Sequence, residues 1–522
     1  MSTGNNSSDG LGSHDKEKGL ANGNTEVHAI EDAPDQVIAK RFGVFGPLLS
    51  KLFQSGVEAR GVERVPENQR ETKNSWNNLL MWWSVNMVLT TIPVGVLAQY
   101  AFTLTLPHAV ATIFCFAALG SVATAFIAIL GPQTGLRTMI ISRYSSGYLG
   151  GTFFSVLNII TQLGFATTAV ILGGQTLAST NANTLPLVGG IIIIGVCSLI
   201  PCFIGYNIIH VYERYAWMAT LFIMCCLYGL GSKAGYDVNA QKASEDTGRA
   251  LSADILSFGA IVFGSVAGWA PVAADYNVRL PVDTNPWRVF VLTFCGLFLP
   301  IVFTVTLGAT LMTIGDPVYA DALGSDGNTG ALVAQVLSLW GGGGKFLLVL
   351  LALSVVSNNI PNTYSAALSI QALGRPFAMV PRFLWVLLVF VAYTVAGVAG
   401  REHFSAILSN FLSILSYWTA FFIVIVAEEH FLFRQKEGRL GGYNLADWDN
   451  PSKLPIGIAG LLACCFGIVG AVVGMSQVWY TGPIGKMAGA AHGADLGFEL
   501  AAGFAAVTFP PLRWMEIRLT GR

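Results

Sequence analysis

Ser354-Val355-Val356-Ser357-Asn358-Asn359-Ile360-Pro361 is a polar stretch inside a long apolar run, and that run predicts a membrane span. Hydrocarbon offers no water, so a buried amide there is costly unless protein or ligand completes its hydrogen bonds. Pro361 contributes no N–H, and its ring excludes the carbonyl four residues earlier, so we expect a broken helix beside a cavity. Polar groups at membrane depth are functional candidates. The stretch therefore predicts a binding site.

The polar residues of this span form a stripe. Ser354, Asn358, Pro361 and Ser365 follow the spacing i, i+4, i+7 and i+11, which places them on one face of a helix. Asn359 points about 100° away from that face. Hydrogen bonding between packed helices is the alternative use for such residues.

Composition extends the membrane prediction to the whole chain. Hydrophobic residues make up 53% and charged residues 11% of the 522 residues, whereas soluble domains carry about 25% charge. At roughly 20 apolar residues per span, we expect about twelve transmembrane helices. All but six of the 29 lysines and arginines then fall on the side that holds both termini, which the positive-inside rule assigns to the cytoplasm. The predicted fold class is all-α integral membrane.

The chain is expected to have three parts. Residues 1–56 form a cytosolic tail that lacks the apolar segment of a signal peptide and is disordered at least to about residue 35. Residues 57–511 form the twelve-helix transporter domain, and residues 512–522 form a second cytosolic tail. The eight cysteines all fall within predicted spans, where we interpret them as small core residues.

Several function classes fit the sequence poorly. A net charge of −1 argues against a nucleic-acid partner, which needs a basic face. An intramembrane enzyme needs paired carboxylates, a metal cluster or a Ser/His nucleophile at depth, and we find no such pattern. A channel needs a repeated ring of pore-lining residues. The prediction is a transporter of a small solute, not an enzyme, with no cofactor and no metal site.

Two predicted spans carry interruptions. Span 1 contains Ser84 and then Pro93, and span 6 contains Gly268 and Pro271. Interrupted helices that each open a set of five spans indicate an inverted-repeat transporter with a site at the membrane midplane. The count of five, five and two spans fits. Gly, Ser and Pro also serve as packing and kink residues in membrane helices, which is the alternative.

Several ordered motifs carry a family resemblance. They are Val57-Glu58-Ala59-Arg60-Gly61-Val62-Glu63-Arg64-Val65-Pro66, Trp76-Asn77-Asn78, Ser84-Val85-Asn86, His210-Val211-Tyr212-Glu213-Arg214-Tyr215, Gly268-Trp269-Ala270-Pro271, Ala274-Asp275-Tyr276 and Asn358-Asn359-Ile360-Pro361. Together they resemble the fungal purine-cytosine permeases, the Fcy-like branch of nucleobase-cation-symport family 1, from about residue 57 to about residue 515. The resemblance implies a LeuT-like fold in the plasma membrane and proton-coupled uptake of nucleobases.

The resemblance also implies a site between spans 1, 3, 6 and 8. Trp269 and Phe165 would sandwich the base, Asn358 and Asn359 would hold its edge, and Ser84 and Pro361 would complete the substrate-binding set. The physical basis is independent of the family, because stacking recognises any planar base and contributes about 1–3 kcal/mol. An Asn amide offers both a donor and an acceptor to the edge of the base.

One position departs from the family pattern. These permeases usually carry an amide one turn after the span 3 aromatic residue, and this chain has Ala169 there. Gln162, or the hydroxyls of Thr167 and Thr168, could compensate. The exact nucleobase stays open, and a related planar heterocycle such as vitamin B6 (pyridoxine) is the second candidate substrate.

Coupling to an ion needs a titratable group or a cation site. The candidate proton carriers are Glu213 and Asp275, and each has a structural alternative as a helix-end residue paired with a nearby arginine. His210 is expected to be structural. A sodium ion is the competing idea, bound between spans 1 and 8 with the hydroxyls of Ser354 or Ser357.

Overall fold

A computed structural model describes residues 61–70, 75–181, 184–204, 206–242, 245–435, 440–489 and 493–522; the side chains of residues 203–214 and 240 lie outside this description. The chain divides into two units, Met1–Arg60 and Gly61–Arg522, and only the second is described. The predicted N-terminal tail, 1–56, lies outside the described residues.

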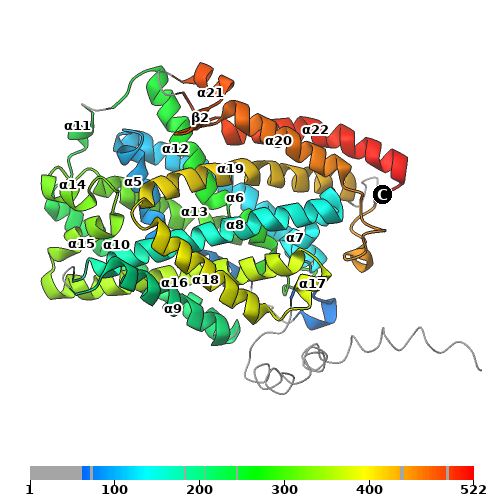
Figure 1. The fold of residues 1–522 in the computed structure, drawn as a ribbon, viewed down its shortest axis with the longest axis horizontal. Helices are drawn as coiled ribbons and strands as arrows, with labels where there is room; N and C mark the ends of the chain where they lie inside the picture. Colours follow the sequence, from blue (N-terminus) through cyan, green and yellow to red (C-terminus); the bar gives the residue numbers. More distant parts are fainter. Residues whose placement is uncertain are drawn as a thin grey trace, which may run out of the picture. The chain divides into compact units, whose positions relative to one another are not determined.

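Helices dominate the second unit (Figure 1). The first half contains η2 (Glu67–Gln69), α4 (Trp76–Asn86), η3 (Leu89–Thr91), α5 (Ile92–Tyr100), α6 (Leu106–Thr134), α7 (Thr138–Ile141), α8 (Arg143–Ala178), α9 (Leu187–Ile204), α10 (Tyr206–Ala234) and α11 (Val238–Gln241). The second half contains α12 (Arg249–Ala267), η4 (Ala270–Tyr276), α13 (Pro286–Leu311), α14 (Pro317–Leu323), α15 (Thr329–Ser338), α16 (Gly341–Ala372), α17 (Arg375–Ala378), α18 (Arg382–Gly400), α19 (Phe404–Glu428), the π-helix η5 (Glu429–Arg434), η6 (Leu445–Asp447), α20 (Ile458–Gly474), α21 (Pro483–Ala488) and α22 (Gly497–Thr520). A short antiparallel hairpin pairs β1 (Ser476–Gln477) with β2 (Tyr480–Thr481).

Length and hydropathy identify the membrane-crossing helices. Among the described residues, eight helices are long and apolar enough to cross a membrane, and there are up to nine spans if the bent pair Trp76–Asn86 and Leu89–Tyr100 counts as one. Shorter apolar helices cover Leu187–Cys202, Thr329–Ser338 and Ile458–Gly474. The all-α membrane class is therefore observed, while the total of about twelve spans stays a prediction.

The helices pack in a way that brings distant segments together (Figure 1). Helix α8 runs along α16, α13 packs against α6 and α5, and α12 packs against α6 and α19. At the end of the chain α20 and α22 form a closely packed pair. Glycines allow one of these contacts, because a Cβ at Gly95 would overlap the Val305 carbonyl and one at Gly308 would overlap the Ile92 carbonyl. Helices α5 and α13 therefore meet backbone to backbone.

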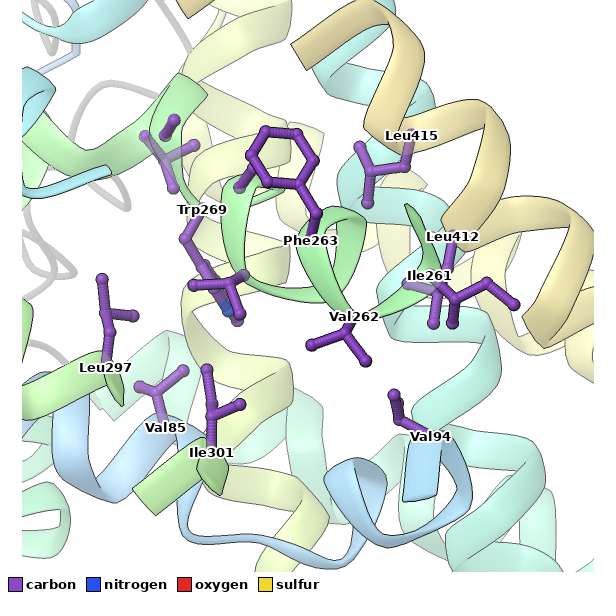
Figure 2. Packing of buried hydrophobic residues seen from close by; sticks show 14 of the residues in the cluster. Val85, Val94, Ile261, Val262, Phe263, Trp269, Leu297, Ile301, Leu412 and Leu415 are labelled. Atoms are coloured by element: carbon purple, nitrogen blue, oxygen red, sulfur yellow. The ribbon is translucent and has the colours of Figure 1, made fainter. Parts of the chain in front are cut away.

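Apolar side chains fill the space between α12 and its neighbours. Figure 2 shows Val262 and Phe263 projecting to opposite sides of α12, with Leu412 and Leu415 of α19 nearby. The ring of Phe263 stacks on Phe498 of α22, with ring centroids 4.3 Å apart. Helix α12 is thus packed against its neighbours up to its end at Ala267, two residues before Trp269.

The predicted boundary at residue 511 falls inside a helix. Helix α22 continues to Thr520, so residues 512–520 are helical, and their cytosolic location stays a prediction. The reason is a buried guanidinium, because Arg513 is fully enclosed and donates to both carboxylate oxygens of Glu429. Charges in this segment are therefore part of the packed structure, although the sequence alone placed them outside it.

Candidate functional site

Span 1 breaks between two helices. Helix α4 ends at Asn86, Val88 is extended (φ −140°, ψ 163°), and the chain axis bends by 62° before α5. A continuous helix would have bonded the Val85 carbonyl to the Leu89 N–H. The break leaves both groups free, and a helix end buried without partners is costly.

Helix α16 supplies the missing partners. The Asn358 amide donates to the Val85 carbonyl at 3.0 Å, and the Leu89 N–H donates to the Ser354 hydroxyl oxygen at 3.1 Å. Two side chains one turn apart on α16 therefore replace the single backbone bond that the break removes. The polar stripe predicted from spacing is real, and this is its structural use.

The helix break expected at Pro361 does not occur. Helix α16 runs from Gly341 to Ala372 with Pro361 inside it. The Pro361 carbonyl accepts a hydrogen bond from the Tyr276 hydroxyl at 3.3 Å, and Ser365, one turn later, lies 3.0 Å from the same hydroxyl. These contacts join α16 to η4 beside the proline, whereas the carbonyl that Pro361 leaves without its backbone donor is that of Ser357, four residues earlier.

The two predicted stacking residues meet face to face. The rings of Phe165 on α8 and Trp269, which follows α12, are parallel to within 5°, with centroids 5.5 Å apart. Phe411 of α19 packs edge-on against Phe165 at 5.2 Å, and Trp82 of α4 packs edge-on against Trp269 at 5.8 Å. Three helices, α4, α8 and α19, and the segment that follows α12 therefore contribute aromatic rings to one cluster, in which Trp82 and Trp269 are buried and Phe165 and Phe411 are partly buried.

Gly268 makes this arrangement possible. The chain changes from α-helix to 3₁₀-helix around this residue, while Arg249–Tyr276 as a whole is long and apolar enough to be one span, so the broken helix 6 stays a prediction. A Cβ at Gly268 would lie 2.8 Å from the Phe165 ring and 2.7 Å from Leu415. Any larger residue would therefore push the Phe165 ring away from Trp269.

Helices α4 and α16 carry buried polar groups that have no hydrogen-bond partner among the described residues. Asn359 is fully buried, and neither its amide nitrogen nor its oxygen has a partner within the described part of the chain. The same holds for the buried Ser84 hydroxyl and for the Trp82 indole N–H. Native proteins rarely leave such groups unpaired, so each needs an explanation such as a ligand. These atoms are candidates for hydrogen bonds to a polar ligand.

The two neighbouring asparagines therefore differ. Both polar atoms of the Asn358 side chain are hydrogen-bonded: its nitrogen donates to the Val85 carbonyl, and its oxygen accepts from Asn362 at 3.0 Å. The Asn359 side chain makes no hydrogen bond within the described residues. Asn362 was missed by the sequence reasoning, although the i+4 spacing from Asn358 could have revealed it; its own oxygen has no partner among the described residues.

The structure also locates the position that departs from the family pattern. Ala169 is fully buried on α8 and carries no polar group. The Thr168 hydroxyl is used locally, donating to the Gly164 and Phe165 carbonyls. Gln162 is fully buried, and its oxygen has no partner in the described residues. Of the proposed substitutes for the missing amide, Gln162 thus combines burial with an unpaired atom.

The ion-coupling candidates fall in different environments. The Ser354 hydroxyl donates to the Leu351 carbonyl at 2.6 Å as well as accepting from Leu89, and Ser357 is buried. Asp275 is buried at the end of η4, where its carboxylate accepts from the backbone N–H and the hydroxyl of Thr138 at 2.7 and 3.1 Å. Within the described residues, no group of three or more metal-ligating side chains converges.

Two further candidates lie where side chains are not described. Glu213 and His210 belong to α10, whose backbone is described there, but their surroundings fall outside the described side chains. Their roles stay predictions.

The sequence reasoning missed one buried acid. Asp495 lies in the segment between α21 and α22, where its carboxylate accepts from the Tyr417 hydroxyl, from Gln477 at 2.7 Å and from the Gly497 N–H at 2.9 Å. Burial raises the pKa of Asp495 to about 6, although these donors oppose the shift. A single aspartate in a loop gives no sequence signal for this.

The raised pKa of Asp495 predicts a pH-dependent stability. Folding disfavours the ionised form, so the stability that Asp495 contributes is present below about pH 4 and is lost as the pH rises through about 6. The loss is at most about 3 kcal/mol. The melting temperature of the purified protein should therefore fall between about pH 4 and pH 6, and Asp495→Asn should flatten part of that fall. Equal slopes in the two proteins would contradict the assignment.

Comparison with known proteins places these features in a family. Residues 64–496 match the family described as permease for cytosine/purines, uracil, thiamine, allantoin. A purine-cytosine permease of Emericella nidulans is 37% identical over 469 residues, covering 89% of this chain and 90% of the relative. A purine-cytosine permease of Saccharomyces cerevisiae is 34% identical over 516 residues, covering 97% and 95%. A vitamin B6 transporter of the same yeast is 30% identical over 523 residues, covering 91% and 90%.

Solved structures support the same assignment of the fold. A nucleobase-cation-symport-1 family transporter in a closed conformation, with bromovinylhydantoin bound, superposes with a TM-score of 0.64 at 13% identity, covering 89% of this chain and 97% of that one. A sodium-coupled sialic acid symporter superposes with a TM-score of 0.56 at 10% identity, covering 93% and 98%. The LeuT-like fold expected from the motifs is confirmed. The chain is a multi-pass membrane transporter and belongs to the family of permeases for cytosine/purines, uracil, thiamine and allantoin.

Proposed function

We propose that this protein is a proton-coupled symporter that carries a nucleobase, cytosine or a purine such as adenine, guanine or hypoxanthine, across the plasma membrane into the cell. One observation carries the proposal: the buried ring of Trp269 and the partly buried ring of Phe165 lie parallel, and α16, which packs against the helix of Phe165, holds a fully buried, unpartnered amide, Asn359. A flat, apolar-faced ligand with donors and acceptors on its edge satisfies both features.

The ring pair has to open to admit the base. Carbon atoms in contact are about 3.5–4.0 Å apart, so a base between two rings needs the rings roughly 7 Å apart. At 5.5 Å between centroids, Phe165 and Trp269 instead contact each other. We infer that the structure represents a closed form, in which Phe165 occupies the face of Trp269 that the base takes when it binds.

Each substrate-binding residue then has a definite role. Trp269 and Phe165 provide the stacking faces, Asn359 reads the edge of the base, and Ser84 adds a hydroxyl from α4. Pro361 contributes by shaping α16 beside them. Asn358 acts indirectly, because it fixes the broken end of α4 and so positions Ser84.

A proton is the better-supported coupling ion. A sodium ion between spans 1 and 8 would compete for the Ser354 hydroxyl, which already joins the Leu89 N–H to the Leu351 carbonyl. Ser357 alone would supply a side-chain oxygen there without that competition. Buried Asp275, and Glu213 on α10, are the proposed proton carriers within the membrane domain. The proposed orientation places both termini in the cytoplasm, as the distribution of lysine and arginine indicates.

Vitamin B6 is the second candidate substrate. A vitamin B6 transporter is 30% identical to this chain over most of its length, and Ala169 removes one amide from the expected set. Pyridoxine is a planar heterocycle with polar groups on its edge, so the same rings and amide can bind it.

The test is uptake in yeast that lacks its own nucleobase and vitamin B6 carriers. Radiolabelled adenine, cytosine, hypoxanthine and pyridoxine are offered at pH 5 and pH 7, with and without a protonophore and with sodium replaced by choline. We expect uptake of at least one base that is faster at pH 5 and abolished by the protonophore. Uptake of pyridoxine alone would support the second candidate, and dependence on sodium would overturn the proton assignment.

A further inference from the structure

Three buried side chains form a hydrogen-bonded relay between α8 and α16. The Asn158 amide nitrogen lies 2.7 Å from the Ser369 hydroxyl, and the Gln162 amide nitrogen lies 3.0 Å from the Asn158 oxygen. Gln162 and Asn158 are fully buried and Ser369 is nearly so. The free end of the relay is the Gln162 oxygen, which has no partner in the described part of the chain.

The relay ends beside the stacking pair. Gln162 lies three residues before Phe165 on α8, and side chains at that spacing are neighbours about 5–6 Å apart at Cβ. Gln162 and Ala169 are seven residues apart, so they share one helix face with Phe165 between them. Gln162 therefore lies about one turn before Phe165 along this face, and Ala169, where the family's usual amide is missing, lies about one turn after it.

The direction of the relay can reverse without loss. An amide carries a donor at one end and an acceptor at the other, and a hydroxyl can both donate and accept. If both amides turn by half a rotation, Ser369 donates to the Asn158 oxygen and the Asn158 nitrogen donates to the Gln162 oxygen. Two hydrogen bonds remain, and Gln162 then presents its NH₂ group in place of its oxygen.

We propose that this relay makes Gln162 a reversible reader of the base edge, so that one site accepts both amino-substituted and oxo-substituted bases. The inference rests on the proposed function. Adenine presents an exocyclic amino donor where hypoxanthine presents a carbonyl acceptor, so a fixed group would favour one and reject the other. Gln162 is the specificity-determining residue, and Asn158 and Ser369 are positioning residues that set its direction.

Two substitutions should bias the relay in opposite directions. In Asn158→Asp the carboxylate only accepts, so both neighbours must donate to it and Gln162 is left presenting its oxygen. In Ser369→Ala the Asn158 side chain loses the hydroxyl to which it is hydrogen-bonded. At that position an unpaired carbonyl is tolerated better than an unpaired N–H. The Asn158 oxygen then turns outward and Gln162 presents its NH₂ group.

The measured quantity is the ratio of apparent affinities for adenine and hypoxanthine, from uptake competition at pH 7 in cells with matched surface abundance. Asn158→Asp should shift this ratio towards adenine by at least about tenfold, equivalent to one lost hydrogen bond. Ser369→Ala should shift it towards hypoxanthine by about threefold. A merely structural role would lower both affinities together and leave the ratio unchanged.

Gln175→Glu is the matched control. Gln175 lies on the same helix, is buried, and also has an unpaired oxygen, but it is thirteen residues from Gln162 and outside the relay. Its ratio should equal that of the wild type. Unchanged ratios in both relay variants, with base uptake intact, would overturn the inference alone, and Ser369→Ala decides it if the aspartate variant does not reach the surface. Absence of base uptake by the wild type would overturn the proposed function and this inference together.

Discussion

Asn359→Ala should abolish nucleobase uptake, by at least about a hundredfold, while the amount of transporter at the cell surface stays normal. The side chain has no protein partner within the described residues, so its removal strands no other polar group. Each hydrogen bond lost to the base costs about 1–3 kcal/mol, and losing both the donor and the acceptor reaches a hundredfold or more. The measurement is initial uptake rate, normalised to surface abundance from a fluorescent tag.

Asn358→Ala is the natural contrast, because the two residues are adjacent and chemically identical. Asn358 holds the Val85 carbonyl and accepts from Asn362. Its loss should therefore lower the melting temperature of the purified protein, whereas Asn359→Ala should leave it unchanged or raise it. If Asn359→Ala destabilised the protein as much as Asn358→Ala and uptake per surface molecule stayed intact, the division of roles would be wrong.

Hydropathy and charge were sufficient to predict that this is a helical membrane protein, but the positions at which helices break were harder to predict. The sequence placed the interruption of span 1 in a stretch that holds Ser84 and then Pro93; the chain breaks inside that stretch, at Met87 and Val88, and Pro93 itself lies in the first turn of α5. Proline is well suited there, because an N–H group in the first turn has no acceptor within the helix and its absence removes no hydrogen bond. Pro361 shows the opposite case, because α16 continues through it. The position of a proline in the sequence therefore does not by itself determine where a membrane helix breaks.

At the candidate site, too, the sequence predicted some features and missed others. The sequence motifs named Trp269, Phe165 and Asn359, and the structure brings the two rings into direct contact. The motifs could not predict which polar side chains already form hydrogen bonds within the protein. Asn358 and Ser354 are occupied by backbone atoms of α4 and η3, about 270 residues away in the chain. The Gln162 relay depends on Ser369 in the same way. Such partners follow from packing between distant helices, which spacing along one helix does not reveal.

A buried ion cluster joins the two ends of the C-terminal half. Glu429 of η5 accepts from Arg434 at 2.8 Å and from Arg513 of α22 at 2.8 and 3.1 Å. Arg513 also lies 3.4 Å from Glu516, whose carboxylate accepts from the Gly457 N–H before α20. Two carboxylates thus pair with two guanidinium groups, and these contacts link the end of α19, the start of α20 and the C-terminal part of α22.

Glu429→Ala should destabilise the folded transporter strongly. It leaves Arg434 and Arg513 buried without their shared carboxylate, and breaking a buried pair in this way costs about 3–5 kcal/mol. We expect little folded protein by size-exclusion chromatography after mild heating, and low surface abundance. Glu402→Ala is the matched control, because Glu402 pairs with Arg401 at 2.9 Å but is 70% exposed, and exposed pairs contribute little. Equal melting temperatures for the two variants would show that the cluster adds nothing beyond a surface ion pair, and the continuation of α22 to Thr520 would then need another cause.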